Sequence, residues 1–165
     1  MKFQLIDQIV ELEPGRRIVA RKSVSLAEEY LADHFPTFPV LPGVFMLEAL
    51  VQASAWVVRE RLDFAPGLVL LKEARNVTYK SFVMPGQTLT VESVCQELTA
   101  DQSVFAASGA VGDRPTVKGR LTLRHLRLTD LDSGLAETET QLRAHWQALF
   151  ARLCRTGGVT LASGA

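Results

Sequence analysis

His34 and Glu48 are the residues of this chain whose types and spacing best suit acid–base chemistry. His34 opens a segment, 34–42, that contains three prolines. It cannot be helical, because each proline fixes its own φ and pushes the preceding residue towards extended conformations. Glu48 follows 14 positions later, in an apolar run from Val44 without Pro or Gly, which predicts a helix. Because imidazole titrates near neutral pH and burial favours a neutral carboxyl group, we expect an acid–base pair.

The helix expected over 44–61 is apolar on nearly every side, with Glu48, Gln52 and Ser54 as its interruptions. A helix that is apolar all round is typically buried. The acidic and amide side chains within 41–58 indicate a buried globular helix and not a membrane span. Gln52 lies one turn after Glu48, so we expect it to support that carboxyl group and not to react itself.

The remaining core is predicted to be β-structure. Consecutive strands with short turns predict an antiparallel sheet, which must wrap round the apolar helix to bury it, giving an α+β fold. The free sheet edge needs cover or a partner chain, so a homodimer is expected. Ser25, with Glu28 three positions later, predicts a capping box for a short helix over 27–32. The expected strands are 3–13, 16–26, 68–80, 88–98, 103–111 and 116–127.

The sequence changes character after residue 128. We expect a core domain over 1–128 and a C-terminal extension over 129–165. Apolar residues at helical spacing predict an amphipathic helix over 137–155, and the small, Gly-rich residues 156–165 predict a frayed end. This helix is expected to pack across the sheet edge or at a subunit contact.

Composition narrows the class of protein. The 165 residues carry 18 basic and 18 acidic side chains, which argues against general nucleic-acid binding. Cys95 and Cys154 form neither a disulfide framework nor a metal-ligand cluster, so we expect no metal, no cofactor and a reducing cytoplasm. His125 and His145 are expected to be solvated.

Residues 34–44, His-Phe-Pro-Thr-Phe-Pro-Val-Leu-Pro-Gly-Val, together with Glu48, carry a family resemblance. They resemble the 3-hydroxyacyl-[acyl-carrier-protein] dehydratases of type II fatty-acid synthesis, which are hot-dog-fold enzymes. The family pattern is His-Phe-Pro-Gly-x-Pro-x-x-Pro-Gly-Val, followed by Glu. Residues 83–89 resemble the family's Val-x-Pro-Gly-Asp-x-Leu strand entry. Two positions depart from the pattern: Thr37 stands for the usual Gly, and Gln87 for the usual Asp.

The resemblance implies removal of water from a 3-hydroxyacyl thioester on acyl carrier protein, giving the trans-2-enoyl thioester. It implies His34 as the base and Glu48 as the acid, acting directly or through a bound water. Gly43 at the helix start offers its N–H, with the other first-turn amides, to the thioester carbonyl oxygen. Glu at the acid position, where isomerising relatives usually carry Asp, favours dehydration alone. In this family the His and Glu of one site come from different subunits, which implies a homodimer or a trimer of such dimers.

The acyl chain needs an apolar tunnel, and an acidic carrier protein needs basic residues near its mouth. Arg75 and Lys80 are candidates for the carrier contact. Two other functions stay open: a thioester hydrolase on the same fold, and a non-catalytic acyl-chain or carrier-protein binding module. The product distinguishes the three, because they yield an enoyl thioester, a free acid or neither. The tunnel candidates are Phe35, Phe38, Val44 and Phe45, with Trp56 deeper.

Overall fold

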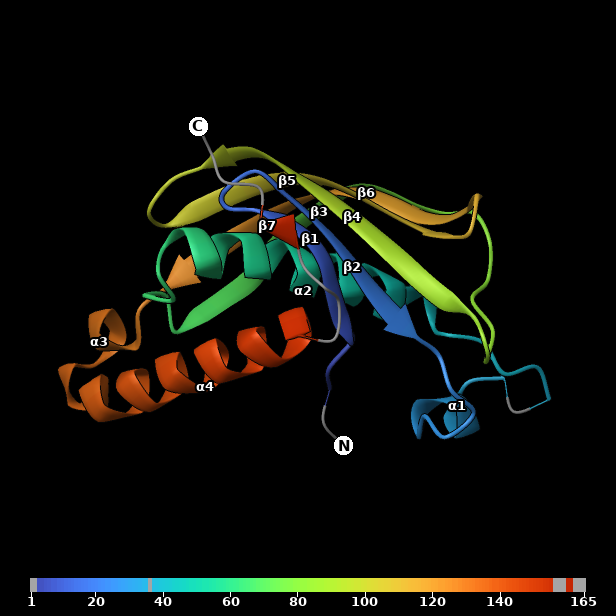
Figure 1. The fold of residues 1–165 in the computed structure, drawn as a ribbon, viewed down its shortest axis with the longest axis horizontal. Coiled ribbons are helices and arrows are strands. Elements are labelled where there is room, and N and C mark those ends of the chain that lie inside the picture. Colours follow the sequence, from blue (N-terminus) through green and yellow to red (C-terminus); the bar gives the residue numbers. More distant parts are fainter. Residues whose placement is uncertain (1–2, 36, 156–159, 162–165) are drawn as a thin grey trace.

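A single curved sheet wraps round one long helix in the computed structural model, which describes residues 3–35, 37–155 and 160–161 (Figure 1). The central helix is α2 (Gly43–Arg61), and its buried face packs against strands β2 to β6. The expected helix and its buried position are confirmed. Ser54 crosses this interface, since its Oγ lies 2.7 Å from the Oγ of Ser93 in the sheet.

The strands lie in the order β3-β6-β5-β4-β2-β1-β7. Strands β1 to β6 pair antiparallel throughout, as expected, while the short β7 pairs parallel to β1. The long strand β3 forms one edge of the sheet. The bounds are β1 (Gln8–Glu13), β2 (Arg17–Ser23), β3 (Leu68–Tyr79), β4 (Thr88–Leu98), β5 (Gln102–Val111), β6 (Arg114–Leu126) and β7 (Thr160–Leu161).

The short helix before the His34 loop begins later than expected. It is α1 (Tyr30–Asp33), and the capping box does not form. Ser25 Oγ accepts a hydrogen bond from the N–H of Ala27, while the Glu28 carboxylate turns to Lys22 in the sheet. An ion pair with Lys22, six residues earlier on β2, has therefore replaced the capping interaction on which the prediction rested.

Two short helical turns, α3 (Leu128–Leu131) and η1 (Ser133–Leu135), lead into the C-terminal helix α4 (Ala136–Arg155). The helix itself is confirmed. It contacts β1 near one edge of the sheet, and the alternative that was expected, a subunit contact, stays a prediction. Helix α4 lies beneath the C-terminal half of α2, on the side away from the sheet, where its aromatic side chains cover Trp56 (Figure 1). Within the predicted frayed end, residues 160–161 pair with β1, and the others lie outside the described residues.

The expectation that His125 is solvated is also wrong. The side chain is 5% exposed, and its Nε2 lies 2.8 Å from the Oγ of Ser103. Its Nδ1 lies 3.3 Å from the carbonyl oxygen of Ala100, which makes Nδ1 the donor. Burial lowers the pKa of His125, so the imidazole is neutral at pH 7. His145 is exposed, as expected.

Candidate active site

His34 lies at the end of α1, where a proline-rich turn follows. The turn closes through a 2.8 Å hydrogen bond from the N–H of Phe38 to the carbonyl oxygen of Phe35. A second anchor runs from the N–H of Leu41 to the carbonyl oxygen of Val83, also at 2.8 Å. The loop is therefore fixed at both ends, which holds the imidazole in place beside the start of α2.

The two departures from the family pattern, Thr37 and Gln87, both lie in loops. Among the described residues of the loop that holds Thr37, Phe35 adopts a positive φ, at 50°. Gln87 accepts a backbone N–H within the turn, a role that the Asp of the family pattern could also fill. Its Oε1 accepts the N–H of Met84 at 3.0 Å and the Nη2 of Arg114 at 3.3 Å. Gln87 therefore keeps the turn closed without the aspartate of the family pattern.

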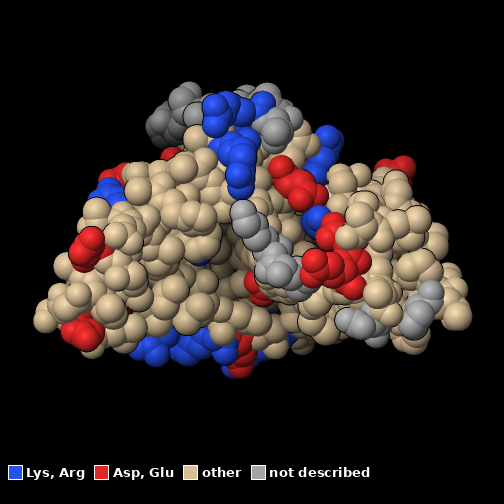
Figure 2. Space-filling model, turned by 90° about the horizontal axis from the view of Figure 1, so that it is seen from below, with Lys and Arg blue, Asp and Glu red and all other residues tan. Residues whose placement is uncertain are grey.

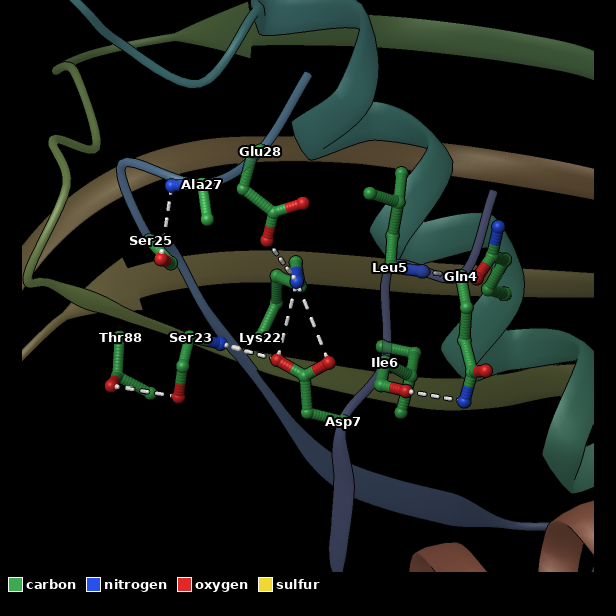
Figure 3. A network of polar contacts seen from close by, with 11 residues as sticks. Gln4, Leu5, Ile6, Asp7, Lys22, Ser23, Ser25, Ala27, Glu28 and Thr88 are labelled. Carbon is green, nitrogen blue, oxygen red and sulfur yellow. Dashed lines mark hydrogen bonds and ion pairs between the residues drawn. The ribbon is translucent and has the colours of Figure 1, made fainter. Parts of the chain in front are cut away.

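A buried ion-pair network supports the segment that leads to His34 (Figure 3). Lys22 on β2 is 5% exposed, and its Nζ lies 2.7 Å from Glu28 and 3.3 Å from Asp7. Asp7 also accepts the N–H of Ser23 at 2.8 Å. A buried ammonium group is stable only when it is paired and hydrogen-bonded, so the three side chains hold the N-terminal segment, β2 and the approach to α1 together.

The start of α2 offers unpaired backbone donors next to this loop. The N–H groups of Phe45 and Met46 both donate to the carbonyl oxygen of Pro42, at 2.9 and 3.2 Å. The N–H groups of Gly43 and Val44 come earlier in the first turn, where no intrahelical acceptor exists. Together with the positive end of the helix dipole, they can stabilise an oxygen that gains negative charge.

A small cavity of about 200 Å³ brings His34 and Gly43 together. A Cβ on Gly43 would lie 3.3 Å from the ring of Tyr79, so glycine lets this ring approach the helix start. Lys80 lines the same cavity, whereas the other basic candidate, Arg75, pairs with Glu73 on the strand. The other lining residues are Val40, Leu41, Met46, Ser81 and Phe82.

Glu48 is held by the amide of Gln52, as the helical spacing predicts. The Nε2 of Gln52 donates to a Glu48 oxygen at 3.0 Å and lies 3.3 Å from the carbonyl oxygen of Phe3. Its Oε1 accepts the N–H of Leu5 at 2.9 Å. Gln52 thus orients the carboxyl group and ties it to the N-terminal segment.

His34 and Glu48 do not share a cavity within one chain. Glu48 lines a different cavity of about 490 Å³, which lies between α2, α4 and the N-terminal segment. The four predicted tunnel residues line neither cavity: Phe35, Phe38 and Val44 are exposed, and Phe45 is packed on Phe3 and Tyr30. Trp56 does line the large cavity.

Arg59 and the part of α4 that faces it were not predicted from the sequence. Both line the large cavity, where the guanidinium of Arg59 lies over the ring of Trp146. The spacing of Arg59 from Glu48 and Gln52 places all three on one face of α2, and this periodicity is the signal that could have found it. Among the described residues, no His, Cys, Asp and Glu side chains gather as metal ligands would. The helices that the structure describes are too short or too polar to cross a bilayer.

Comparison with known proteins identifies the class. A family model described as a FabA-like domain matches residues 1–117. The chain is 37% identical over 122 residues to the 3-hydroxyacyl-[acyl-carrier-protein] dehydratase FabZ of Symbiobacterium thermophilum, covering 74% of this chain and 84% of that protein. The FabZ of Ruminiclostridium cellulolyticum is 41% identical over 91 residues, covering 55% of this chain and 64% of that protein, just under two thirds of its length.

Comparison with solved structures agrees with the family match. A structure titled "The Dehydratase Heterocomplex ApeI:P from Xenorhabdus doucetiae" superposes with a TM-score of 0.64 at 21% identity, covering 81% of this chain and 90% of that one. The fold is the hot-dog fold, as expected. The chain belongs to the FabA-like family of 3-hydroxyacyl-[acyl-carrier-protein] dehydratases.

Proposed function

We propose that this protein removes water from 3-hydroxyacyl thioesters carried on acyl carrier protein and yields trans-2-enoyl thioesters, in fatty-acid or related lipid synthesis. The observation that carries the proposal is the geometry at the start of α2. There His34 and the first residue of the helix, Gly43, line one cavity, and a carboxyl group held by an amide follows just over one turn later. The family match supports the same reaction.

The residues divide the reaction between them. His34 takes a proton from the carbon next to the thioester carbonyl, and the electron pair of the broken C–H bond moves towards the carbonyl oxygen. The N–H groups of Gly43 and Val44 stabilise the negative charge that develops on this oxygen. Glu48 donates a proton to the hydroxyl group at the third carbon as the carbon–oxygen bond breaks, so that water leaves and the double bond forms.

The separation of His34 from Glu48 supports a site shared between two subunits. One chain offers an imidazole in one cavity and a carboxyl group in another, so a complete pair needs a second copy. The edge strand β3 supports this, because unpaired strand edges with apolar side chains favour pairing. Exposed apolar residues on or near it are Val44, Leu70, Leu71, Tyr79 and Phe82. The proposed assembly is a homodimer, with a trimer of dimers as its larger form.

The proposed carrier contact is Lys80, which lines the His34 cavity and has no ion-pair partner among the described residues. A cation at the mouth attracts an acidic carrier protein and speeds its approach. The exposed side chains of Phe35, Phe38 and Val44 are proposed to line the acyl path once a second subunit covers them. The free thiols of Cys95 and Cys154 suit the reducing cytoplasm proposed as the compartment.

Mass spectrometry of purified protein incubated with a medium-chain 3-hydroxyacyl-carrier protein tests the proposal. Wild type is expected to convert the substrate to a product lighter by one water. His34→Ala and Glu48→Gln should each lose at least about a hundredfold in rate, because each removes one proton-transfer group. Glu97→Gln changes an exposed strand carboxylate and serves as the matched control, with the wild-type rate expected.

Two results would overturn the proposal. Release of free acid would identify a thioester hydrolase. Unchanged substrate that stays bound to the protein would identify a binding module.

A further inference from the structure

The large cavity has a chemical character that dehydration does not explain. It follows one face of α2 from Glu48 to Arg59, a length of about 16 Å at the helical rise per residue. Its walls combine polar and apolar side chains, and the apolar ones include Ile6, Val51, Ala55, Val69 and Leu149. Seen from below, this face of the molecule is hollowed between the α4 side and the α1 side (Figure 2).

Arg59 stands at one end of this cavity as a buried cation without an anion. Its side chain is 7% exposed, and its Nε is buried without a hydrogen-bond partner. Among the described residues, no carboxylate pairs with its guanidinium. The neighbours of the charged group are the rings of Trp146 and Trp56, with centroids 4.1 and 5.2 Å from Cζ. Burial lowers the pKa of Arg59 to about 10, so the side chain stays charged at neutral pH.

Two aromatic faces do not compensate this burial. A guanidinium carries five N–H donors, and aromatic rings accept them only weakly. A buried charge without hydrogen bonds costs free energy, and a bidentate carboxylate is the partner whose geometry matches the guanidinium fork. The other basic lining residues, Arg152 and His145, are exposed on α4, so water screens them. The buried end of the cavity is thus suited to a single negative charge.

We propose that the cavity between α2 and α4 binds an alkyl chain that ends in a carboxylate, with the carboxylate on Arg59 and the chain along α2 towards Glu48. Two molecules offer this chemistry: a free fatty acid, and an acyl substrate whose far end carries a carboxylate. The second source rests on the proposed function, because Glu48 would then act on the thioester end of the same chain. Binding itself does not depend on that activity.

Calorimetric titration of the full-length protein with dodecanoate and with the uncharged dodecan-1-ol tests binding. We expect dodecanoate to bind at least tenfold more tightly than the alcohol, and Arg59→Met to remove this difference. Arg155→Met changes an arginine of α4 that does not line the cavity and should retain it. Ala55→Leu fills the cavity without changing its charge and should weaken both ligands.

Thermal unfolding of the free protein distinguishes a ligand-binding arginine from a structural one. Met should be tolerated at position 59 without a loss of melting temperature, because it replaces a buried unpaired charge with an apolar chain of similar size. A large loss of melting temperature in Arg59→Met with dodecanoate affinity unchanged would overturn the proposal. So would equal affinity of wild type for dodecanoate and dodecan-1-ol.

Turnover identifies the source of the carboxylate. Wild type is given 3-hydroxydodecanoyl-carrier protein and its counterpart with a carboxylate at the far end. A preference of at least tenfold in kcat/KM for the second, lost in Arg59→Met, assigns the site to the substrate. Inhibition by dodecanoate without that preference assigns it to a free fatty acid. Dehydration of both substrates at equal rates without any dodecanoate effect would overturn this inference and leave the proposed function intact.

Discussion

The two ends of α2 differ in what encloses them. At the N-terminal end, His34 and Gly43 line a small cavity built from the part of the chain that the FabA-like family model matches. Towards the C-terminal end, a cavity more than twice as large is closed by α4, which lies after the matched residues. We infer that the part of the fold shared with the family holds the proposed reacting residues, His34, Gly43 and Glu48. The C-terminal helix α4 would then determine which ligand binds along α2.

Gln52 lies between the two ends, and changing it is expected to give the largest effect outside the acid–base pair. Gln52→Leu removes the hydrogen bond that orients Glu48, so kcat should fall about tenfold. Gln141→Leu, which breaks an exposed amide contact to Glu137 on α4, is the matched control. An unchanged kcat in Gln52→Leu would contradict a role of the Glu48 carboxyl group in the reaction.

Phe150→Ala tests the packing of α4 against the C-terminal end of α2. Phe150 packs on Trp56 and Phe64 but does not line the large cavity. The truncation should lower the free energy of unfolding by about 2 kcal/mol, since the side chain is half-buried. Urea denaturation measures this loss, and the rate with a short-chain substrate should stay near the wild-type value. A fall in that rate as large as the one expected for Gln52→Leu would mean that α4 takes part in the chemistry.

The stability of the protein should depend on pH through the buried His125. Because burial lowers the pKa of His125, the unfolded chain binds a proton there before the folded one does. Stability is therefore lost as pH falls below about 6.5, the ordinary value for histidine. Melting temperatures between pH 7.5 and 5.5 should fall more steeply in wild type than in His125→Gln, and this is the smallest of the three effects. Equal slopes would show that folding leaves the pKa of His125 unchanged, which would contradict the effect of burial.

Most of the fold and the candidate acid–base pair could be predicted from local sequence signals. Prolines and an unbroken apolar run are readable without tertiary information, so the His34 loop and α2 were predicted nearly to the residue. The start of α1 was not, because the Glu28 carboxylate pairs with Lys22 on β2 and does not cap the helix. Strand alternation likewise does not reveal that His125 faces a covered side of the sheet.

The cavity under α4 was beyond sequence reasoning for a related reason. An amphipathic pattern predicts that a helix has an apolar face but does not name the surface that it covers. The position of Arg59 against Trp146 therefore emerges only from the packing of α2 on α4.

The most direct test of the shared site is complementation between His34→Ala and Glu48→Gln. If each site takes its imidazole from one subunit and its carboxyl group from the other, a mixed dimer contains one intact site and one that lacks both groups. Co-expressed variants that associate at random should then recover about a quarter of wild-type dehydratase activity, although each alone is inactive. Activity in the mixture no higher than in the separate variants would contradict the account, because it would place both groups of each site in one chain.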